Sequence, residues 1–354
     1  MNAVAASGIG SLPGTDVEGA ARAVRELYGD GGLPYLVELP ARGPGADLIG
    51  RTAAQLTGLA VDLQPAGWRL TDAAGRDAAR ARAYLRQDLD VLAEVYDGYT
   101  GALKVQFCGP WTLAATLALP RGERVVSDPG AARDIVQSLA DTVVEHLQQV
   151  RRLVPGAVAT VQWDEPALPA VLAGRLPTAS GYGRVRAVDP NVVRDGLLRL
   201  TETVGREADS QIMHCCAADV PVPLVRQVAG LELGLDTSLI RAAQWDGIAE
   251  LVESGRRLWA GLVPTDSTAR HPRQSGGRTA NDAEPDGRAR YESFHQHVDP
   301  FVGQWHRVGL EPALLEQVVV TPACGLSGLS PAEAQRIGRL TVDAAHAIRD
   351  LAER

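Results

Sequence analysis

The chain has 354 residues, 45% of them hydrophobic, so it can bury a large core. Its formal net charge of -8 and the lack of a Lys- or Arg-rich block argue against nucleic-acid binding. No apolar run is long enough to span a bilayer, and we expect no membrane association. The N-terminus lacks the basic and apolar regions of a secretory signal, and four cysteines make a poor disulfide framework. We therefore expect a cytoplasmic protein with reduced thiols.

Short apolar strands alternate with amphipathic helices along the chain. The first strand opens into a glycine-rich turn, after which Asp16 is predicted to cap a helix. The predicted strands are 7–11, 35–39, 103–108, 158–163, 211–216, 230–236, 257–263 and 318–324. The longest predicted helices are 76–96, 129–154, 191–207, 291–308 and 331–351.

About eight strands, each followed by a helix, predict a single (β/α)8 TIM barrel spanning residues 1–354. A doubly wound sheet is the alternative, but it would gather residues from distant strands less naturally. The polar stretch 265–290 shows no hydrophobic periodicity, and we interpret it as a mobile loop or lid.

Polar residues fall where the predicted strands end. They are Ser11, Glu38, Cys108, Asp164, His214, Cys216, Asp236 and Cys324. Barrel enzymes build their active sites from the carboxyl ends of their strands, so this pattern predicts one shared site.

Four of these residues suggest a metal site. His214 and Cys216 are two residues apart, so on a strand their side chains project to the same side. Imidazole and thiolate are zinc ligands, and Asp236 and Cys324 could complete the set. Cys215 should point the other way and pack in the core, and Cys108 is interpreted as structural.

Carboxylates form a second candidate group. Asp164 and Glu165 are adjacent, so one should enter the pocket and the other should pair with a surface base. Glu38 lies in an apolar strand and would be costly to bury without a cation. That cation is either Arg42 or Arg51, or the amine of a ligand.

Together these groups suit chemistry on a thiol. Zinc held by thiolates keeps a bound substrate thiolate nucleophilic, which favours alkylation over hydrolysis. An amino-acid thiol would need carboxylates for its ammonium group, and Glu38 and Asp164 are the natural pair. Backbone N–H groups of the turn Ile9, Gly10 and Ser11 could hold its carboxylate.

Five short motifs resemble the catalytic barrel of cobalamin-independent methionine synthase, and they occur in the family's order along nearly the whole chain. They are Ile9-Gly-Ser11, Gln162-x-Asp164-Glu-Pro-Ala167, His214-x-Cys216, Leu235-Asp-Thr-Ser238 and Pro322-x-Cys324-Gly-Leu326. The resemblance implies a zinc-dependent transfer of a methyl group to the sulfur of homocysteine, giving methionine.

The resemblance also implies roles for residues. His214, Cys216 and Cys324 would bind zinc, with Asp236 as an acidic ligand where the family usually has Glu. The turn 9–11, Glu38 and Asp164 would hold homocysteine. Asp236 and His271 are the catalytic candidates; His271 lies in a segment that loosely echoes one bearing a family histidine.

The family's second, N-terminal barrel has no counterpart here, so the chain looks more like the short, single-barrel branch. The methyl donor would then be methyltetrahydrofolate or a methylated corrinoid, the latter possibly carried on a corrinoid protein.

Three other functions stay open. The same barrel could alkylate a different thiol, such as a coenzyme-M-like acceptor, although a sulfonate would favour a basic pocket. A decarboxylase of the uroporphyrinogen type would need no metal. A structural zinc protein or inactive paralogue is the non-enzymatic alternative.

Overall fold

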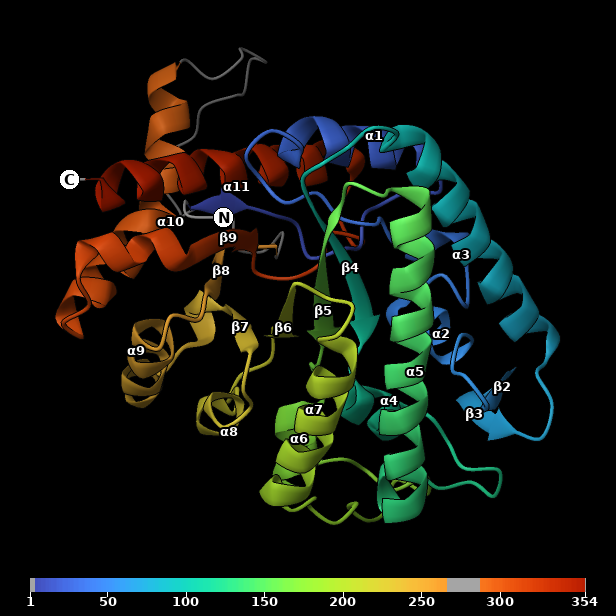
Figure 1. The fold of residues 1–354 in the computed structure, drawn as a ribbon. Coiled ribbons are helices and arrows are strands. Elements are labelled where there is room, and N and C mark those ends of the chain that lie inside the picture. The colour runs from blue at the N-terminus through green and yellow to red at the C-terminus, as the bar shows by residue number, and fades with distance from the viewer. Residues whose placement is uncertain (1–3, 266–286, 354) are drawn as a thin grey trace, which may run out of the picture.

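The computed structural model describes residues 4–265 and 287–353. Its centre is a curled, parallel sheet of seven strands in the order β1-β9-β8-β7-β6-β5-β4, with helices around it (Figure 1). The strands are β1 (Ala5–Ala6), β4 (Ala102–Cys108), β5 (Val158–Asp164), β6 (Ser210–Cys215), β7 (Leu231–Asp236), β8 (Leu258–Val263) and β9 (Val318–Pro322). The predicted α/β class and the order of the strands are confirmed.

The predicted strand 35–39 does not join the sheet as a regular strand. Segment 33–38 instead forms isolated parallel bridges to both edges of the sheet, pairing Leu33 with Ser7 and Tyr35 with Lys104. Pro34 and Pro40 flank the predicted strand 35–39 and lack the N–H that a continuous ladder requires. Similarly, the first strand is shorter and earlier than the predicted 7–11.

The helices match the predicted pattern closely. Asp16 caps the first helix by accepting a 3.1 Å hydrogen bond from Gly19 N. Ser330 and Glu333 form a capping box at the start of the last one. The helices are α1 (Val17–Tyr28), α2 (Leu48–Ala53), α3 (Arg76–Val95), α4 (Pro110–Thr116), α5 (Pro129–Leu153), α6 (Leu168–Leu172), α7 (Pro190–Val204), α8 (Val222–Arg226), α9 (Trp245–Glu253), α10 (Gly287–Arg307) and α11 (Pro331–Ala352).

A β-hairpin in the first third of the chain was not predicted. An antiparallel hairpin of β2 (Ala60–Gln64) and β3 (Gly67–Thr71) lies between α2 and α3, apart from the main sheet. Its strands are short and mostly half-buried.

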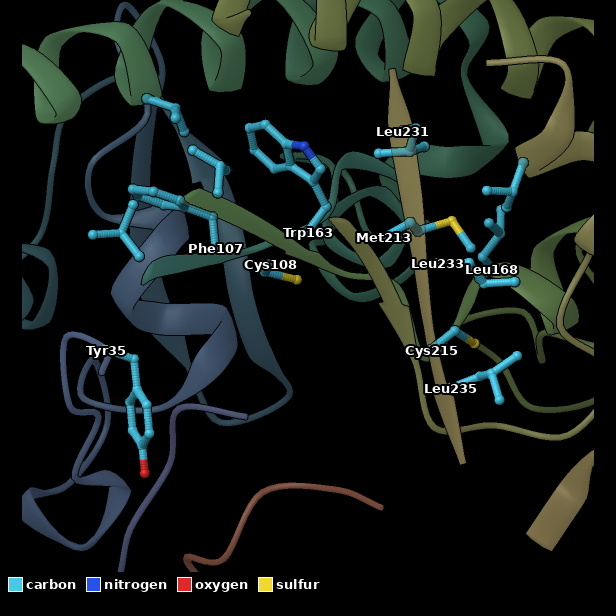
Figure 2. Close-up of a cluster of buried hydrophobic side chains, with 14 of the residues drawn as sticks. Tyr35, Phe107, Cys108, Trp163, Leu168, Met213, Cys215, Leu231, Leu233 and Leu235 are labelled. Carbon is cyan, nitrogen blue, oxygen red and sulfur yellow. The ribbon is translucent and has the colours of Figure 1, made fainter. Parts of the chain in front are cut away.

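The main core lies between the sheet and its helices. Figure 2 shows Cys108 and Cys215 among apolar side chains such as Met213 and Leu235. Both thiols are fully buried, as predicted for packing residues. Within the described part of the chain, no helix is both long and apolar enough to cross a membrane.

Candidate active site

A cavity of about 330 Å³ lies at the carboxyl ends of the strands. Its lining includes eight of the ten residues predicted for the site: Ile9, Gly10, Ser11, Glu38, Asp164, His214, Cys216 and Cys324. Pro40, Asp47, Leu48, Pro166, Gly325 and Ser327 complete it. Segments from the first to the last strand of the sheet therefore meet at one place.

Two thiols face each other in this cavity. The Sγ atoms of Cys216 and Cys324 lie 3.1 Å apart and share a hydrogen bond, and all four cysteines are free. The hydrogen bond with Cys216 lowers the pKa of Cys324, and His214 and a backbone N–H at Gly325 act in the same direction. The Cys324 sulfur is thus the more easily ionised of the two.

His214 has one satisfied and one unsatisfied nitrogen. Its Nδ1 lies 2.7 Å from Oδ1 of Asp164, and its Nε2 is buried and has no hydrogen-bond partner among the residues that the structure describes. In the neutral imidazole, Nδ1 donates to the carboxylate, so Nε2 carries the lone pair. A carboxylate behind an imidazole in this way is the usual support of a metal-binding histidine.

As they stand, these side chains do not form a complete metal site. Among residues 4–265 and 287–353, no group of three or more His, Cys, Asp or Glu side chains is arranged to hold a metal ion. Two thiolates on one tetrahedral zinc ion lie roughly 3.8 Å apart, given Zn–S distances of about 2.3 Å. The sulfurs of Cys216 and Cys324 would have to separate, but the donor types and the unpartnered His214 nitrogen suit zinc.

Glu38 is one of three acidic residues that line the cavity, with Asp47 and Asp164. Glu38 is buried, and burial raises its pKa to about 7 even though Arg51 opposes the shift. The Nε of Arg51 lies 3.8 Å from Oε1 of Glu38, so one of the two predicted partners is present. Arg42 instead pairs with Asp88 at 2.7 Å, and Asp88 also binds Arg51.

The turn after β1 presents free backbone donors. The N–H groups of Gly10 and Ser11 donate to no residue that the structure describes. Gly10 has a φ of 150°, and a Cβ there would lie 2.6 Å from the side chain of Gln106. A Cβ on Gly325 would lie 2.1 Å from Ser11 Oγ, so glycine permits this close approach of the two strand ends.

Lys104 and Gln162 were not predicted as site residues. Lys104 is fully buried on the inner face of the sheet, where burial lowers its pKa to about 7 against the opposing effect of Asp164 and Glu38. The signal was in the sequence: Lys104 and Gln106, and Thr160, Gln162 and Asp164, alternate with apolar residues and so share one face.

Glu165 corrects a prediction. It pairs with no surface base: it is fully buried, and its carboxylate accepts hydrogen bonds from Trp111 N at 2.9 Å and Thr112 N at 2.8 Å. Thr112 Oγ1 donates a third at 2.7 Å. The carboxylate therefore satisfies the first N–H groups of α4, whose N-terminus has no side-chain cap of its own.

Asp236, the other predicted site residue that the structure describes, does not line this cavity. It ends β7, and its Oδ1 accepts hydrogen bonds from Ser238 N at 2.9 Å and Ser238 Oγ at 2.6 Å. His271, and the predicted loop 265–290 apart from its ends, lie outside the described residues.

The fold and this cavity place the chain among α/β proteins that have a curled parallel sheet and a site at the carboxyl ends of its strands. No protein-family model and no curated protein matches this chain. Among solved structures it is similar to a B12-independent methionine synthase from Shewanella sp. W3-18-1, determined in complex with selenomethionine. The TM-score is 0.58 at 12% identity, covering 98% of each chain. At this identity, the likeness shows a shared fold.

Proposed function

We propose that this chain is a zinc-dependent methyltransferase that moves a methyl group to the thiol of homocysteine, giving methionine. The observation that carries the proposal is one cavity lined by two thiols, a supported imidazole, the carboxylates of Glu38 and Asp164 among others, and a turn with free N–H groups. The fold shared with a methionine synthase supports the same reading.

In this proposal the inner sheet closes as a single (β/α)8 barrel over the whole chain. The bridges of segment 33–38 to Ser7 and Lys104 at the two sheet edges support closure. So does a small inner cluster of Leu33, Ile212, Trp259 and Val319, which brings that segment against β6, β8 and β9.

His214, Cys216 and Cys324 would hold zinc, and Asp236 would join them only after giving up its hydrogen bonds to Ser238. Bound zinc would keep the substrate sulfur ionised at neutral pH. Asp164 would keep the Nε2 lone pair of His214 turned toward the cavity.

The amino-acid end of homocysteine would lie across the carboxylate side of the cavity. Glu38 and the second oxygen of Asp164 would bind the ammonium group. The N–H groups of Gly10 and Ser11 would bind the carboxylate. The thiolate sulfur then forms a bond to the methyl carbon, and the bond from that carbon to the donor breaks with its electron pair leaving on the donor.

The donor would be methyltetrahydrofolate or a methylated corrinoid, free or protein-bound. His271, the second predicted catalytic residue, lies outside the described residues. Transfer to a coenzyme-M-like thiol is the second candidate; the paired carboxylates Glu38 and Asp164 favour an ammonium-bearing substrate over a sulfonate. A uroporphyrinogen-decarboxylase-like reaction would leave the paired thiols without a role.

The direct test supplies zinc-loaded protein with homocysteine and, in separate assays, methyltetrahydrofolate or methylcobalamin. We expect methionine with one donor, and none from Cys324→Ser. Cys215→Ala, which removes a core-facing thiol next to a proposed ligand, should stay active. Methionine formation by metal-free protein at the full rate would contradict the proposal.

A further inference from the structure

A hydrogen-bonded chain runs across the inner face of the sheet beneath the cavity. The Nζ of Lys104 donates to Gln162 Oε1 at 2.6 Å and to the carbonyl oxygen of Ile9 at 2.8 Å. The Nε2 of Gln162 donates to the same carbonyl at 2.9 Å and to Asp164 Oδ1 at 2.8 Å. That Asp164 oxygen is the one that faces Nδ1 of His214.

This chain links two parts of the site that belong to distant segments. One end is the turn 9–11, the proposed carboxylate-binding part, and the other is His214, a proposed metal ligand. Lys104 Nζ and Gln162 Nε2 both donate to the carbonyl oxygen of Ile9, which lies on the turn. A triangle of three hydrogen bonds therefore fixes the turn, Lys104 and Gln162 relative to one another.

Lys104 is held in place on its remaining side as well. Its Nζ lies 5.2 Å from the centre of the Tyr35 ring, within range of a cation–π interaction. The side chain is fully buried, and its two hydrogen-bond acceptors are a neutral carbonyl and a neutral amide. Burying a cation without a carboxylate in contact is costly for stability, so stability alone does not account for it.

We propose that Lys104 is a positioning residue. Its ammonium group binds both Ile9 O and Gln162 Oε1. It thereby fixes the turn 9–11, which holds the amino-acid end of the substrate, relative to the Asp164–His214 pair. The identity of that substrate rests on the proposed function, whereas the link between Lys104 and His214 does not.

The variant Lys104→Met removes the ammonium group at similar volume. Gln162→Met breaks the chain at its next member while the ammonium group stays. Thr160→Val is the control, because Thr160 is the register partner of Lys104 on β5, is equally buried and bonds to Ser210 outside the chain. Folding of each variant is checked by circular dichroism and thermal unfolding.

The first readout uses metal-free protein and is independent of any reaction. In ¹⁵N-histidine-labelled protein, the Nδ1–H proton of His214, assigned with His214→Asn, should be protected from exchange with water in the wild type and in Thr160→Val. It should lose that protection in Lys104→Met and in Gln162→Met. A folded Lys104→Met that keeps the protection of the control would overturn the proposal; if that variant does not fold, the same result in Gln162→Met overturns it.

The second readout is homocysteine binding to zinc-loaded protein by calorimetry. We expect the Kd to rise about tenfold in Lys104→Met and to change less than about twofold in Thr160→Val, since a hydrogen-bonded charge is involved. If the wild type binds no homocysteine, the proposed function fails, and the His214 proton still decides the role of Lys104. An unchanged Kd in a folded Lys104→Met would contradict the role in substrate positioning.

Discussion

The two sides of the cavity are built differently. On the sulfur side, the Sγ atoms of Cys216 and Cys324 share a hydrogen bond, and His214 Nε2 has no partner among the described residues. On the carboxylate side, charged and polar groups are bonded to protein: Arg51 and Arg42 hold Asp88, and Gln162 holds Asp164. Buried polar groups are normally satisfied, yet a nitrogen on each side, His214 Nε2 and Arg51 Nη2, has no hydrogen-bond partner among the described residues. Both sides therefore leave a buried nitrogen free for an external partner, and the paired thiols lie only on the sulfur side.

The largest expected effect tests the sulfur side. Cys324→Ser should lower zinc affinity by roughly a thousandfold or more, because a thiolate ligand is replaced by a poor one. Competition with a chromophoric chelator measures this, with Cys215→Ala as the control. Equal zinc retention in both variants would remove Cys324 from the metal site.

Glu165 tests a buried carboxylate with a structural role. Glu165→Gln replaces one acceptor oxygen with an NH₂ group facing the donors Trp111 N and Thr112 N. We expect a loss of about 2–3 kcal/mol in the free energy of unfolding, measured with urea. The Arg151–Glu207 pair, in which Arg151 is exposed and Glu207 partly buried, gives the comparison, since Glu207→Gln should cost less than about 1 kcal/mol. A loss from Glu165→Gln no larger than that from Glu207→Gln would show that α4 does not depend on Glu165.

The raised pKa of Glu38 predicts that homocysteine binding depends on pH. Burial raises this pKa to about 7 in the free protein, and only the ionised carboxylate attracts an ammonium group. Homocysteine affinity should therefore fall by up to about tenfold for each pH unit below 7, and Glu38 should contribute no further change above it. Glu38→Gln should bind more weakly and lack this contribution. Parallel pH profiles for the wild type and Glu38→Gln between about pH 5 and 8 would rule out Glu38 as the ammonium partner.

The smallest effect concerns Asp236. Because its carboxylate already caps Ser238, Asp236→Ala should lower zinc affinity by at most about tenfold and stability by about 1 kcal/mol. Chelator competition beside Cys324→Ser measures the first quantity. A loss as large as that of Cys324→Ser would make Asp236 a full ligand.

Sequence periodicity was sufficient to predict most strands of the main sheet, the main helices and the strand-end residues that gather at the cavity. The second predicted strand failed as a regular strand because two prolines flank it. The hairpin β2–β3 was overlooked although Val61 to Gln64 and Trp68 to Thr71 each alternate between apolar and polar residues. Glu165 was misassigned because its partners, the N–H groups at the start of α4, are backbone donors that sequence spacing does not reveal. Lys104 was overlooked although its place in an apolar strand marks it as a buried charge.

The central claim is that the sulfur side holds a zinc ion that binds a substrate thiol. X-ray absorption at the zinc edge, on protein of measured metal content, tests it most directly. We predict about one zinc per chain, bound by sulfur and nitrogen, and one additional sulfur neighbour when homocysteine is added. Zinc that gains no sulfur, or protein that binds no zinc, would contradict this account.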